Sequence, residues 1–277
     1  MRLRKVHDYS IMGPYPLPSS YTPHVPLSED GWKLFAERSV RSDLDFVLGL
    51  LKENQRVLDI GSGYGKIPLE VGSRTGKAYS LEPDPDRLAI QRRNIEKRGV
   101  EIAQGSAESI PFPDRHFDAV ISVFVLHFVA DLDKALCEMI RVTDPTAPNT
   151  QIVVVQGAPD SEVFRLMNEA CAPLSVSNPW PNHQGYLLDR AARVFAQHGF
   201  GDISIYRVDA FSVFEEEELQ QRCKRAAEAI AGLWCWRDEN FGGMVEALVP
   251  EVKGYFDDHP NWIMDQKVAL VARPGNH

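Results

Sequence analysis

Apolar and amphipathic stretches alternate along the chain from residue 56 onward. Short apolar runs predict strands, because a parallel strand that is buried on both faces carries few polar side chains. Between these runs, apolar residues recur at three- and four-residue steps, as in a helix that covers such a sheet. The predicted strands are 56–60, 78–81, 100–104, 117–124, 151–155, 203–208 and 268–272.

Capping residues mark where the predicted helices begin and end. Asp84 is followed by Pro85, and Gly99 closes that helix, as expected for an acid at a helix start and a glycine at its end. Helices that alternate with apolar strands predict an α/β fold whose parallel sheet is covered on both faces. Asp131 precedes a helix with the core-facing stripe Leu132, Ala135, Leu136, Met139 and Ile140.

Two regions lie outside this alternation. Residues 1–55 contain a proline-rich segment with interleaved tyrosines, which predicts an extended tail or a strap across a pocket, followed by two cap helices. Residues 210–265 separate the last two predicted strands and carry a charged helix and several aromatic residues. An insertion of this length predicts a helical lid or ligand-binding lobe. The predicted core is therefore 56–209 together with 266–277.

Charge and composition argue against several classes of protein. The 277 residues include 30 Lys and Arg against 39 Asp and Glu, which gives a net charge of −9. An acidic surface repels phosphate backbones, so nucleic acid is not an expected partner. The four cysteines form no C-x-x-C pair and have no histidine at zinc-finger spacing, so no metal is expected. Because neither a signal peptide nor a bilayer-length apolar run is present, we expect a cytoplasmic protein without membrane insertion.

The strongest chemical signal is a glycine-rich loop after the first strand of the alternating region. From Asp59 to Gly65 the chain reads Asp-Ile-Gly-Ser-Gly-Tyr-Gly. Glycine lets the backbone turn tightly and approach a ligand closely. Glu82 ends the next strand, 82 − 61 = 21 positions after the first glycine, where a carboxylate can accept hydrogen bonds from ribose hydroxyls. The loop and this acid together predict a bound nucleoside.

Two nucleoside ligands fit this geometry, a dinucleotide and S-adenosylmethionine. A pyrophosphate-binding loop prefers the spacing G-x-G-x-x-G, whereas the glycines here follow G-x-G-x-G. Asp59 stands two positions before the first glycine, where it would repel pyrophosphate and would suit the ammonium group of a methionine moiety. The loop therefore favours S-adenosylmethionine.

Here the sequence resembles the class I S-adenosylmethionine-dependent methyltransferases, and within them the small-molecule branch of the ubiquinone-biosynthesis type. The resemblance covers about 57–200, roughly half of the chain. It implies a Rossmann-like, doubly wound sheet of seven strands, with the last strand antiparallel beside the sixth. The cofactor contacts that it implies are Asp59, Gly61, Gly63 and Gly65 around the methionine, Glu82 at the ribose, and Ser106, Ala107 and Glu108 at the adenine. Further implied cofactor contacts are Ser62, Pro83, Ser122 and Val123, and residues 125–128 resemble the region beside the sulfonium.

Two positions depart from the family pattern. Ser106 stands where the family often has Asp, so adenine recognition would depend on backbone groups or on Glu108. The turn before the fifth strand, 144–147, reads Asp-Pro-Thr-Ala instead of Lys-Pro-Gly-Gly, at a place remote from the methyl group.

Methyl transfer is an in-line displacement at a sulfonium carbon, so the protein must align the acceptor and exclude water. A hydroxyl acceptor usually needs a base, whereas an amine or thiol needs little help. His127 follows the fourth strand, where the methyl group is expected, and is a candidate base or loop-orienting residue. His183 lies in a segment that often lines the acceptor pocket in the family. The remaining histidines are expected to be surface or packing residues: His7, His24, His116, His198, His259 and His277.

Aromatic residues indicate where an acceptor would bind. Tyr15 and Tyr21 lie in the proline-rich segment, and Trp180 lies close to His183. Trp234 belongs to the late insertion, where it could line an acceptor site or belong to the core of the lobe itself.

These patterns predict an enzyme that converts S-adenosylmethionine to S-adenosylhomocysteine while it methylates O, N or S of a small, partly apolar metabolite. A natural-product or quinone-type acceptor would fit. One alternative keeps the cofactor without methyl transfer, in a cyclisation, a rearrangement or a binding subunit. A nicotinamide-dependent oxidoreductase is disfavoured by the glycine spacing and by Asp59.

Overall fold

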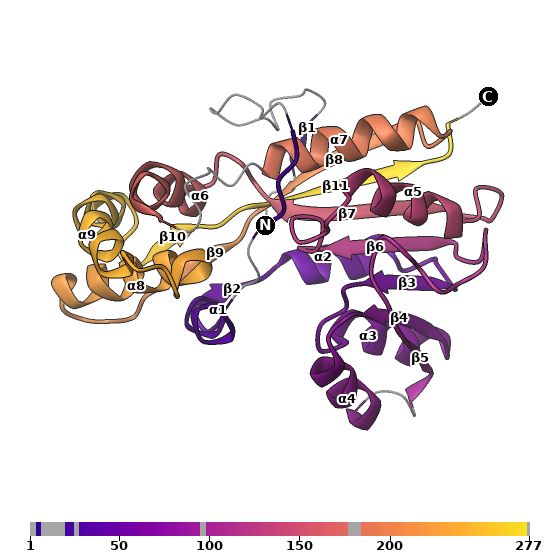
Figure 1. Cartoon of the computed structure of the whole chain (residues 1–277), viewed down its shortest axis with the longest axis horizontal. Coiled ribbons are helices and arrows are strands. Elements are labelled where there is room, and N and C mark those ends of the chain that lie inside the picture. Colours follow the sequence, from indigo (N-terminus) through magenta and orange to yellow (C-terminus); the bar gives the residue numbers. More distant parts are fainter. Residues whose placement is uncertain (1–3, 7–19, 25–27, 95–97, 177–183, 276–277) are drawn as a thin grey trace.

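The computed structural model describes residues 4–6, 20–24, 28–94, 98–176 and 184–275. Its main sheet has the strand order β1-β8-β11-β7-β6-β3-β4-β5 (Figure 1). The strands from β7 to β5 run parallel, and β11 lies antiparallel between β7 and β8. The predicted α/β fold, with its antiparallel last strand beside the sixth, is confirmed. The core strands are β3 (Val57–Ile60), β4 (Ala78–Glu82), β5 (Val100–Gln104), β6 (Ala119–Val123), β7 (Gln151–Gly157), β8 (Asp202–Val208) and β11 (Lys267–Arg273).

One further strand joins the edge of this sheet. β1 (Arg4–Val6) pairs antiparallel with β8. The sequence did not predict β1, because three residues are too few to show an apolar pattern.

Two apolar cores lie on the two faces of the sheet. α5 (Leu132–Val142) and α7 (Gln184–Gln197) cover one face, and α2 (Asp43–Leu50) and α3 (Lys66–Thr75) cover the other. The predicted stripe of α5 is buried except for the partly exposed Ile140. Every position of β3 and β7 is buried, since successive side chains of a strand point to opposite covered faces.

A second body, here called the lobe, has an apolar core of its own and lies to the left in Figure 1. Its helices come from distant parts of the sequence: α1 (Glu29–Ala36), α6 (Glu162–Leu166), α8 (Leu219–Cys235) and α9 (Phe241–Asp258). The lobe therefore includes more than the predicted 210–265 insertion, because α1 and α6 bury apolar side chains against α8 and α9. It also holds a three-stranded sheet of β2 (Ser39–Val40), β9 (Phe211–Val213) and β10 (Trp262–Met264).

Three of the points where the chain crosses between core and lobe are tied together. These points lie between β2 and α2, between β8 and β9, and between β10 and β11. The Ser42 hydroxyl donates to the carbonyl of Asp209, which joins the first crossing to the second. The N–H of Asp265 donates to the carbonyl of Ala210 at 2.8 Å, which joins the third crossing to the second.

Two buried ion pairs strengthen this junction. Arg41 lies 2.5 Å from Asp43, and Lys267 lies 2.5 Å from Asp265. Both cations also contact the ring of Phe124, with the Arg41 Cζ at 5.2 Å and the Lys267 Nζ at 5.1 Å from its centre. The end of β6 is thereby held against the two segments that lead into the lobe.

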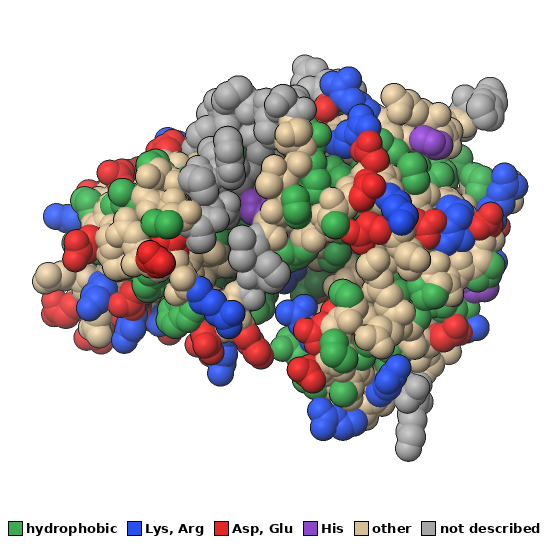
Figure 2. Space-filling view, in the orientation of Figure 1, with side chains coloured by type: hydrophobic (Ala, Val, Ile, Leu, Met, Phe, Trp, Pro, Cys, Tyr) green, Lys and Arg blue, Asp and Glu red, His purple; other side chains and the backbone are tan. Residues whose placement is uncertain are grey.

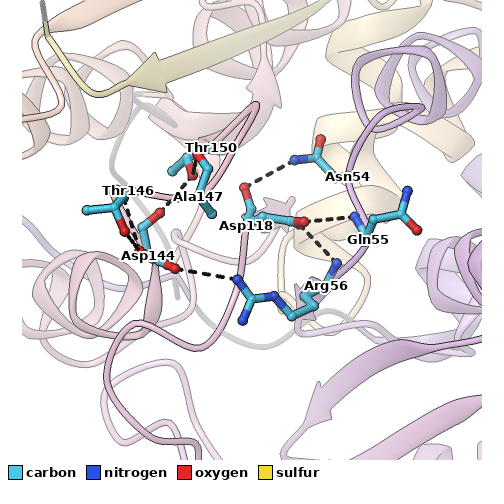
Figure 3. A network of polar contacts seen from close by, with 8 residues as sticks. All are labelled: Asn54, Gln55, Arg56, Asp118, Asp144, Thr146, Ala147 and Thr150. Carbon is cyan, nitrogen blue, oxygen red and sulfur yellow. Dashed lines mark hydrogen bonds and ion pairs between the residues drawn. The ribbon is translucent and has the colours of Figure 1, made fainter.

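A polar network closes the edge where the parallel strands begin (Figure 3). The Asp118 carboxylate accepts the N–H groups of Gln55 and Arg56 at 2.9 and 3.0 Å. The Asn54 amide donates to the Asp118 carbonyl at 3.2 Å, and Arg56 lies 3.4 Å from Asp144. This network aligns the starts of β3 and β6. Its other members, around Asp144, are Thr146, Ala147 and Thr150.

Candidate active site

The opposite edge of the sheet, where the parallel strands end, faces the junction with the lobe (Figure 1). Figure 2 shows that the surface is hollowed where the lobe meets the lower part of the core, near α3 and α4 (Pro85–Asn94). Ligands of open α/β sheets bind at this edge. The predicted cofactor residues from four different strands and loops all lie along it.

The glycine loop joins β3 to α3 in a left-handed conformation. Gly61, Gly63 and Gly65 have φ values of +64°, +58° and +78°, a region that favours glycine. The N–H groups of Gly61 and Ser62 both donate to the carbonyl of Leu81, at 2.7 and 3.1 Å, which fixes the loop to β4. Nothing lies within 4 Å of the position that a Cβ of Gly63 would take. The loop is therefore open at Gly63, where a ligand can approach its backbone.

A buried glutamine holds the glycine loop in place through hydrogen bonds. Gln91 of α4 is fully buried, and its amide nitrogen donates to the carbonyl of Gly63 at 2.6 Å and to the Ser62 hydroxyl at 2.9 Å. Its amide oxygen accepts from the Ser80 hydroxyl at 2.6 Å. Sequence reasoning missed Gln91, although a glutamine on the core-facing side of a helix is a signal that could have found it.

Two buried carboxylates flank the loop. Glu82 is 2% exposed, and its two oxygens accept the N–H groups of Gly63 at 2.8 Å and of Asp84 at 3.1 Å. Asp59 is 4% exposed, and no described residue makes a hydrogen bond with its side chain. Burial, reinforced by the charge of Glu82, raises the pKa of Asp59 well above its ordinary 3.8.

This electrostatic setting discriminates between the two nucleoside ligands. A buried, uncompensated carboxylate is costly, and a cation beside it lowers that cost. The ammonium and sulfonium groups of S-adenosylmethionine are cationic, whereas pyrophosphate would add negative charge next to Asp59 and Glu82. The residues present therefore fit S-adenosylmethionine better than a dinucleotide, because Asp59 could face its ammonium group and Glu82, which keeps free lone pairs, could accept hydrogen bonds from its ribose.

The predicted adenine side is formed by the turn after β5. Ser106 and Pro83 are exposed, whereas Ala107 is buried. One oxygen of the Glu108 carboxylate accepts the N–H of Ala130 at 2.7 Å. Glu108 thus joins the turn to the segment that leads into α5, which fixes one wall of this side of the site.

The end of β6 turns sharply between the cofactor loop and the lobe. Ser122 is paired with Ile60 in the sheet and is completely buried, yet its hydroxyl has no hydrogen-bond partner among the described residues. Val123 is partly exposed. Phe124 has a φ of +57°, a strained value for a bulky residue, which persists only when its surroundings hold it. The contacts of Arg41 and Lys267 with its ring hold Phe124 in this conformation.

His127 lies just beyond this turn and is buried, with 2% of its surface exposed. Its Nδ1 lies 3.2 Å from the Oε1 of Gln156, the penultimate residue of β7. Burial lowers the pKa of His127 to about 3, so the ring is neutral at pH 7. Because a glutamine oxygen can only accept, the Nδ1 carries the proton and the Nε2 carries the lone pair.

A short stretch of the N-terminal segment covers His127. The N–H of His24 donates to the carbonyl of His127 at 2.7 Å, and the two ring centres are 5.8 Å apart. The hydroxyl of Tyr21 lies 2.8 and 2.7 Å from the carbonyls of Leu126 and Val129, so Tyr21 anchors the segment. Residues 20–24, here called the strap, pack against the segment around His127, and most of the predicted proline-rich strap lies outside the described residues.

The lobe completes the enclosure with an aromatic residue. The ring of Trp234 lies 4.9 Å from that of His24, 5.2 Å from that of His127 and 5.9 Å from that of Phe128. Trp234 therefore packs against the core of the lobe and also contacts the core domain. His24, expected to be a surface or packing residue, belongs to this group through its contacts with His127 and Trp234. These ring contacts join residues that are far apart in the sequence, so no local sequence pattern could predict them.

Other predicted residues lie outside the described ranges: Tyr15, Trp180 and His183. Among the described residues, no cluster of three or more His, Cys, Asp or Glu could hold a metal ion. In the same part of the chain, no helix combines the length and apolarity needed to cross a bilayer.

Fold and site together define a class I, nucleoside-binding α/β protein with an acidic pair suited to a sulfonium cofactor. Comparison with known proteins agrees. A family described as "Methyltransferase domain" matches residues 58–147. A ubiquinone/menaquinone biosynthesis C-methyltransferase UbiE of Xylella fastidiosa is 31% identical over 208 residues, which span 72% of this chain and 73% of that protein. The chain belongs to the S-adenosylmethionine-dependent methyltransferases of the UbiE type.

Other relatives match over a shorter stretch. A demethylmenaquinone methyltransferase of Thermus thermophilus is 39% identical over 116 residues, 40% of this chain and 51% of that protein. The chain thus spans about half the length of this relative.

Solved structures show the same fold. The YcgJ protein of Bacillus subtilis superposes with a TM-score of 0.56 at 15% identity, covering 84% of this chain and 98% of that one. A methyltransferase of Thermotoga maritima, described as a possible histamine N-methyltransferase, superposes with a TM-score of 0.52 at 19% identity, covering 89% and 94%.

Proposed function

We propose that the protein transfers the methyl group of S-adenosylmethionine to a small, partly apolar acceptor with an aromatic or quinol-type ring. The observation that carries this proposal is the cluster of neutral rings that His24, His127, Phe128 and Trp234 form beside the end of β6. Two relatives whose names refer to menaquinone support the quinol type. The name of the Xylella fastidiosa relative, a C-methyltransferase, also adds carbon to oxygen, nitrogen and sulfur as the atom that could be methylated.

The residues divide the work between binding and exclusion of water. When bound, S-adenosylmethionine supplies an electrophilic methyl group on its sulfonium. Asp59 would balance the ammonium, and Glu82 would accept the ribose hydroxyls. His127 is too weak a base to take a proton from solution at neutral pH, but its Nε2 lone pair would accept a hydrogen bond from an acceptor hydroxyl. The lobe and the strap would exclude water from the transfer.

The test is incubation of the protein with S-adenosylmethionine and a panel of naphthohydroquinones, catechols, phenols, indoles and aromatic thiols. Liquid chromatography with mass spectrometry would follow S-adenosylhomocysteine and methylated product together. We expect equal amounts of the two from at least one ring-bearing acceptor. Tight binding of S-adenosylhomocysteine without any methylated ring compound would contradict the proposed acceptor class, and conversion of an acceptor without S-adenosylhomocysteine would favour chemistry that leaves the methyl group in place.

A further inference from the structure

Four buried polar atoms near the end of β6 have no hydrogen-bond partner among the described residues. They are the Nδ1 of His24, the Oγ of Ser122, the Nε2 of Gln156 and the Nε1 of Trp234. Buried polar groups in proteins are almost always satisfied, because an unpaired one costs about 1–3 kcal/mol. A group of such atoms therefore needs an explanation, and a bound ligand supplies one.

Contacts through His127 link three of these side chains, and the fourth, Ser122, lies on the same face of the sheet as Gln156. Ser122 pairs with Val154 of β7, and Gln156 follows two residues later, so Ser122 and Gln156 lie on the same face of the sheet. Gln156 contacts His127, whose ring in turn contacts those of His24 and Trp234. The group thus runs from the neighbourhood of the cofactor loop, through Ser122, to the strap and the lobe.

The chemistry of the group limits what it can bind. Trp234 Nε1 and Gln156 Nε2 are donors only, so a ligand must bring oxygen or nitrogen acceptors. Burial lowers the pKa of His24 to about 4, so this ring is neutral at pH 7, as His127 is. No member of the group is charged. Because burial of an unpaired charge is far more costly than burial of a neutral polar group, an ionised acceptor would be excluded.

We propose that His24 is an acceptor-binding residue, which the strap carries into the site to recognise, with Trp234 and Gln156, the oxygen-bearing edge of an uncharged planar ring. This inference rests on the proposed function, since it assigns the recognition of the acceptor in that same site. It gives the strap a definite role: the site is complete only when the N–H of His24 is bonded to the carbonyl of His127.

The first test compares His24→Phe with wild type. Phenylalanine keeps a ring in place and removes Nδ1. The probes are 1,4-naphthohydroquinone and 1-naphthoate, titrated anaerobically by calorimetry in the presence of S-adenosylhomocysteine. We expect His24→Phe to weaken binding of the hydroquinone about 5–30-fold, the value of one buried hydrogen bond. Wild type should bind the charged naphthoate at least about tenfold more weakly than the hydroquinone.

Matched variants show whether the effect is specific. His116 also packs among aromatic rings, Tyr79, Phe112 and Phe117, but at a distance from the site, so His116→Phe should leave both affinities unchanged. His24→Asn places an amide where Nδ1 lies and should restore part of the affinity. All variants should bind S-adenosylhomocysteine as wild type does.

A spectroscopic measurement tests the enclosure without any acceptor. Long-range ¹H–¹⁵N spectra of wild type should show His24 neutral down to about pH 5, because its pKa lies at about 4. A His24 ring that titrates near the ordinary 6.5 would overturn the proposal. So would hydroquinone affinity, or an acceptor KM, that is the same in His24→Phe and in wild type.

The two proposals fail in different ways. If wild type binds the hydroquinone through His24 but methylates no acceptor, the methyl-transfer proposal is wrong and the acceptor site stands. If wild type methylates an acceptor with the same KM in His24→Phe, the assignment of His24 is wrong and the function stands. Failure of wild type to bind the hydroquinone would overturn the ligand chemistry inferred here.

Discussion

Asp118 and Asp59 are both almost completely buried, at 6% and 4% exposed, and they lie at opposite edges of the same sheet. Asp118 accepts two backbone N–H groups, and no buried side-chain atom of the network in Figure 3 is left without a partner. Asp59 has no hydrogen bond from any described residue, and four unpaired polar atoms lie along its edge and the adjoining lobe contact. The polar groups at the two edges are therefore buried to a similar extent, but only those at the first edge all have hydrogen-bond partners.

This difference separates stability from function. A satisfied buried network contributes to folding and leaves nothing for a ligand to bind. An unsatisfied network reduces the stability of the free protein. A ligand that forms the missing hydrogen bonds then stabilises the folded state. Substitutions at the first edge should therefore change folding alone, and substitutions at the second should change binding more than folding.

The largest effect is expected where the site is filled. Gly63→Arg places a long cation in the open side of the loop, so the affinity for S-adenosylhomocysteine should fall about 1,000-fold or more, about 4 kcal/mol. Gly76→Arg is the matched control, because Gly76 also has a left-handed φ, +77°, and open space beside it. Both variants should lose about 1–2 kcal/mol of stability from backbone strain. Calorimetry and thermal unfolding would measure the two effects, and equal affinities in both variants would show that the site is elsewhere.

The next effect belongs to the satisfied edge. Asp118→Ala leaves the N–H groups of Gln55 and Arg56 without their acceptor, so the free energy of unfolding should fall by about 2–4 kcal/mol. Asp118→Asn keeps one acceptor oxygen and should cost about half as much. Affinity for S-adenosylhomocysteine should stay at the wild-type value in the folded protein. Denaturant unfolding and a titration with S-adenosylhomocysteine would check this. A loss of affinity without a loss of stability would show that Asp118 acts in binding and that the two edges do not differ in role.

Asp59→Asn should change binding and stability in opposite directions. Loss of the carboxylate should weaken S-adenosylhomocysteine about 10–100-fold, because the ammonium loses its charged partner. The free protein should become more stable at neutral pH, since a buried uncompensated charge is removed.

The pH dependence of Asp59→Asn carries a definite sign. The raised pKa of Asp59 means that the folded protein keeps this proton to higher pH than the unfolded chain does. Its favourable contribution is complete below the ordinary value of 3.8 and is lost as pH rises through the higher pKa of the fold. Between about pH 4 and pH 7, the free wild-type protein should therefore lose more stability than Asp59→Asn. Parallel pH curves for the two proteins would show that Asp59 is not buried as a charge.

The smallest effect is expected when a single buried hydroxyl is removed at either edge. Ser122 and Thr150 are both buried hydroxyl residues, one at each edge. Thr150 donates to the carbonyls of Asp144 and Ala147, so Thr150→Val should cost about 1–2 kcal/mol of stability. Ser122→Ala removes an unpaired hydroxyl and should raise the free energy of unfolding of the free protein by about 1 kcal/mol. Equal costs in thermal unfolding would mean that Ser122 is satisfied after all.

The sequence predicted the parts of the molecule that local patterns determine. The strands, the stripe of α5 and the glycine loop follow from hydrophobic periodicity and from the backbone freedom of glycine, both of which act over a few residues. The family resemblance then supplied the antiparallel last strand, which periodicity alone does not give. Confirmation of the fold therefore rests on local pattern and resemblance together.

The cluster of rings around His24 could not be predicted in the same way. His24 lies in a proline-rich segment without periodicity, and it meets His127 and Trp234 only because residues about 100 and 200 positions later fold against it. Gln156 gave a signal that went unused, since a polar residue at the end of a buried strand marks the ligand edge. In α9, the residues Met244, Leu248, Val252 and Phe256 recur every four positions, which is a readable helical stripe that was also missed.

The position of β11 has a consequence for synthesis of the protein. β11 (Lys267–Arg273) lies between β7 and β8 in the sheet, although it comes after all the other described strands in the sequence. While the ribosome is still making this segment, β7 and β8 cannot be joined, and both present open edges to other chains. The nascent protein is therefore most prone to aggregation just before β11 emerges, when nearly all of its apolar surface has already been made.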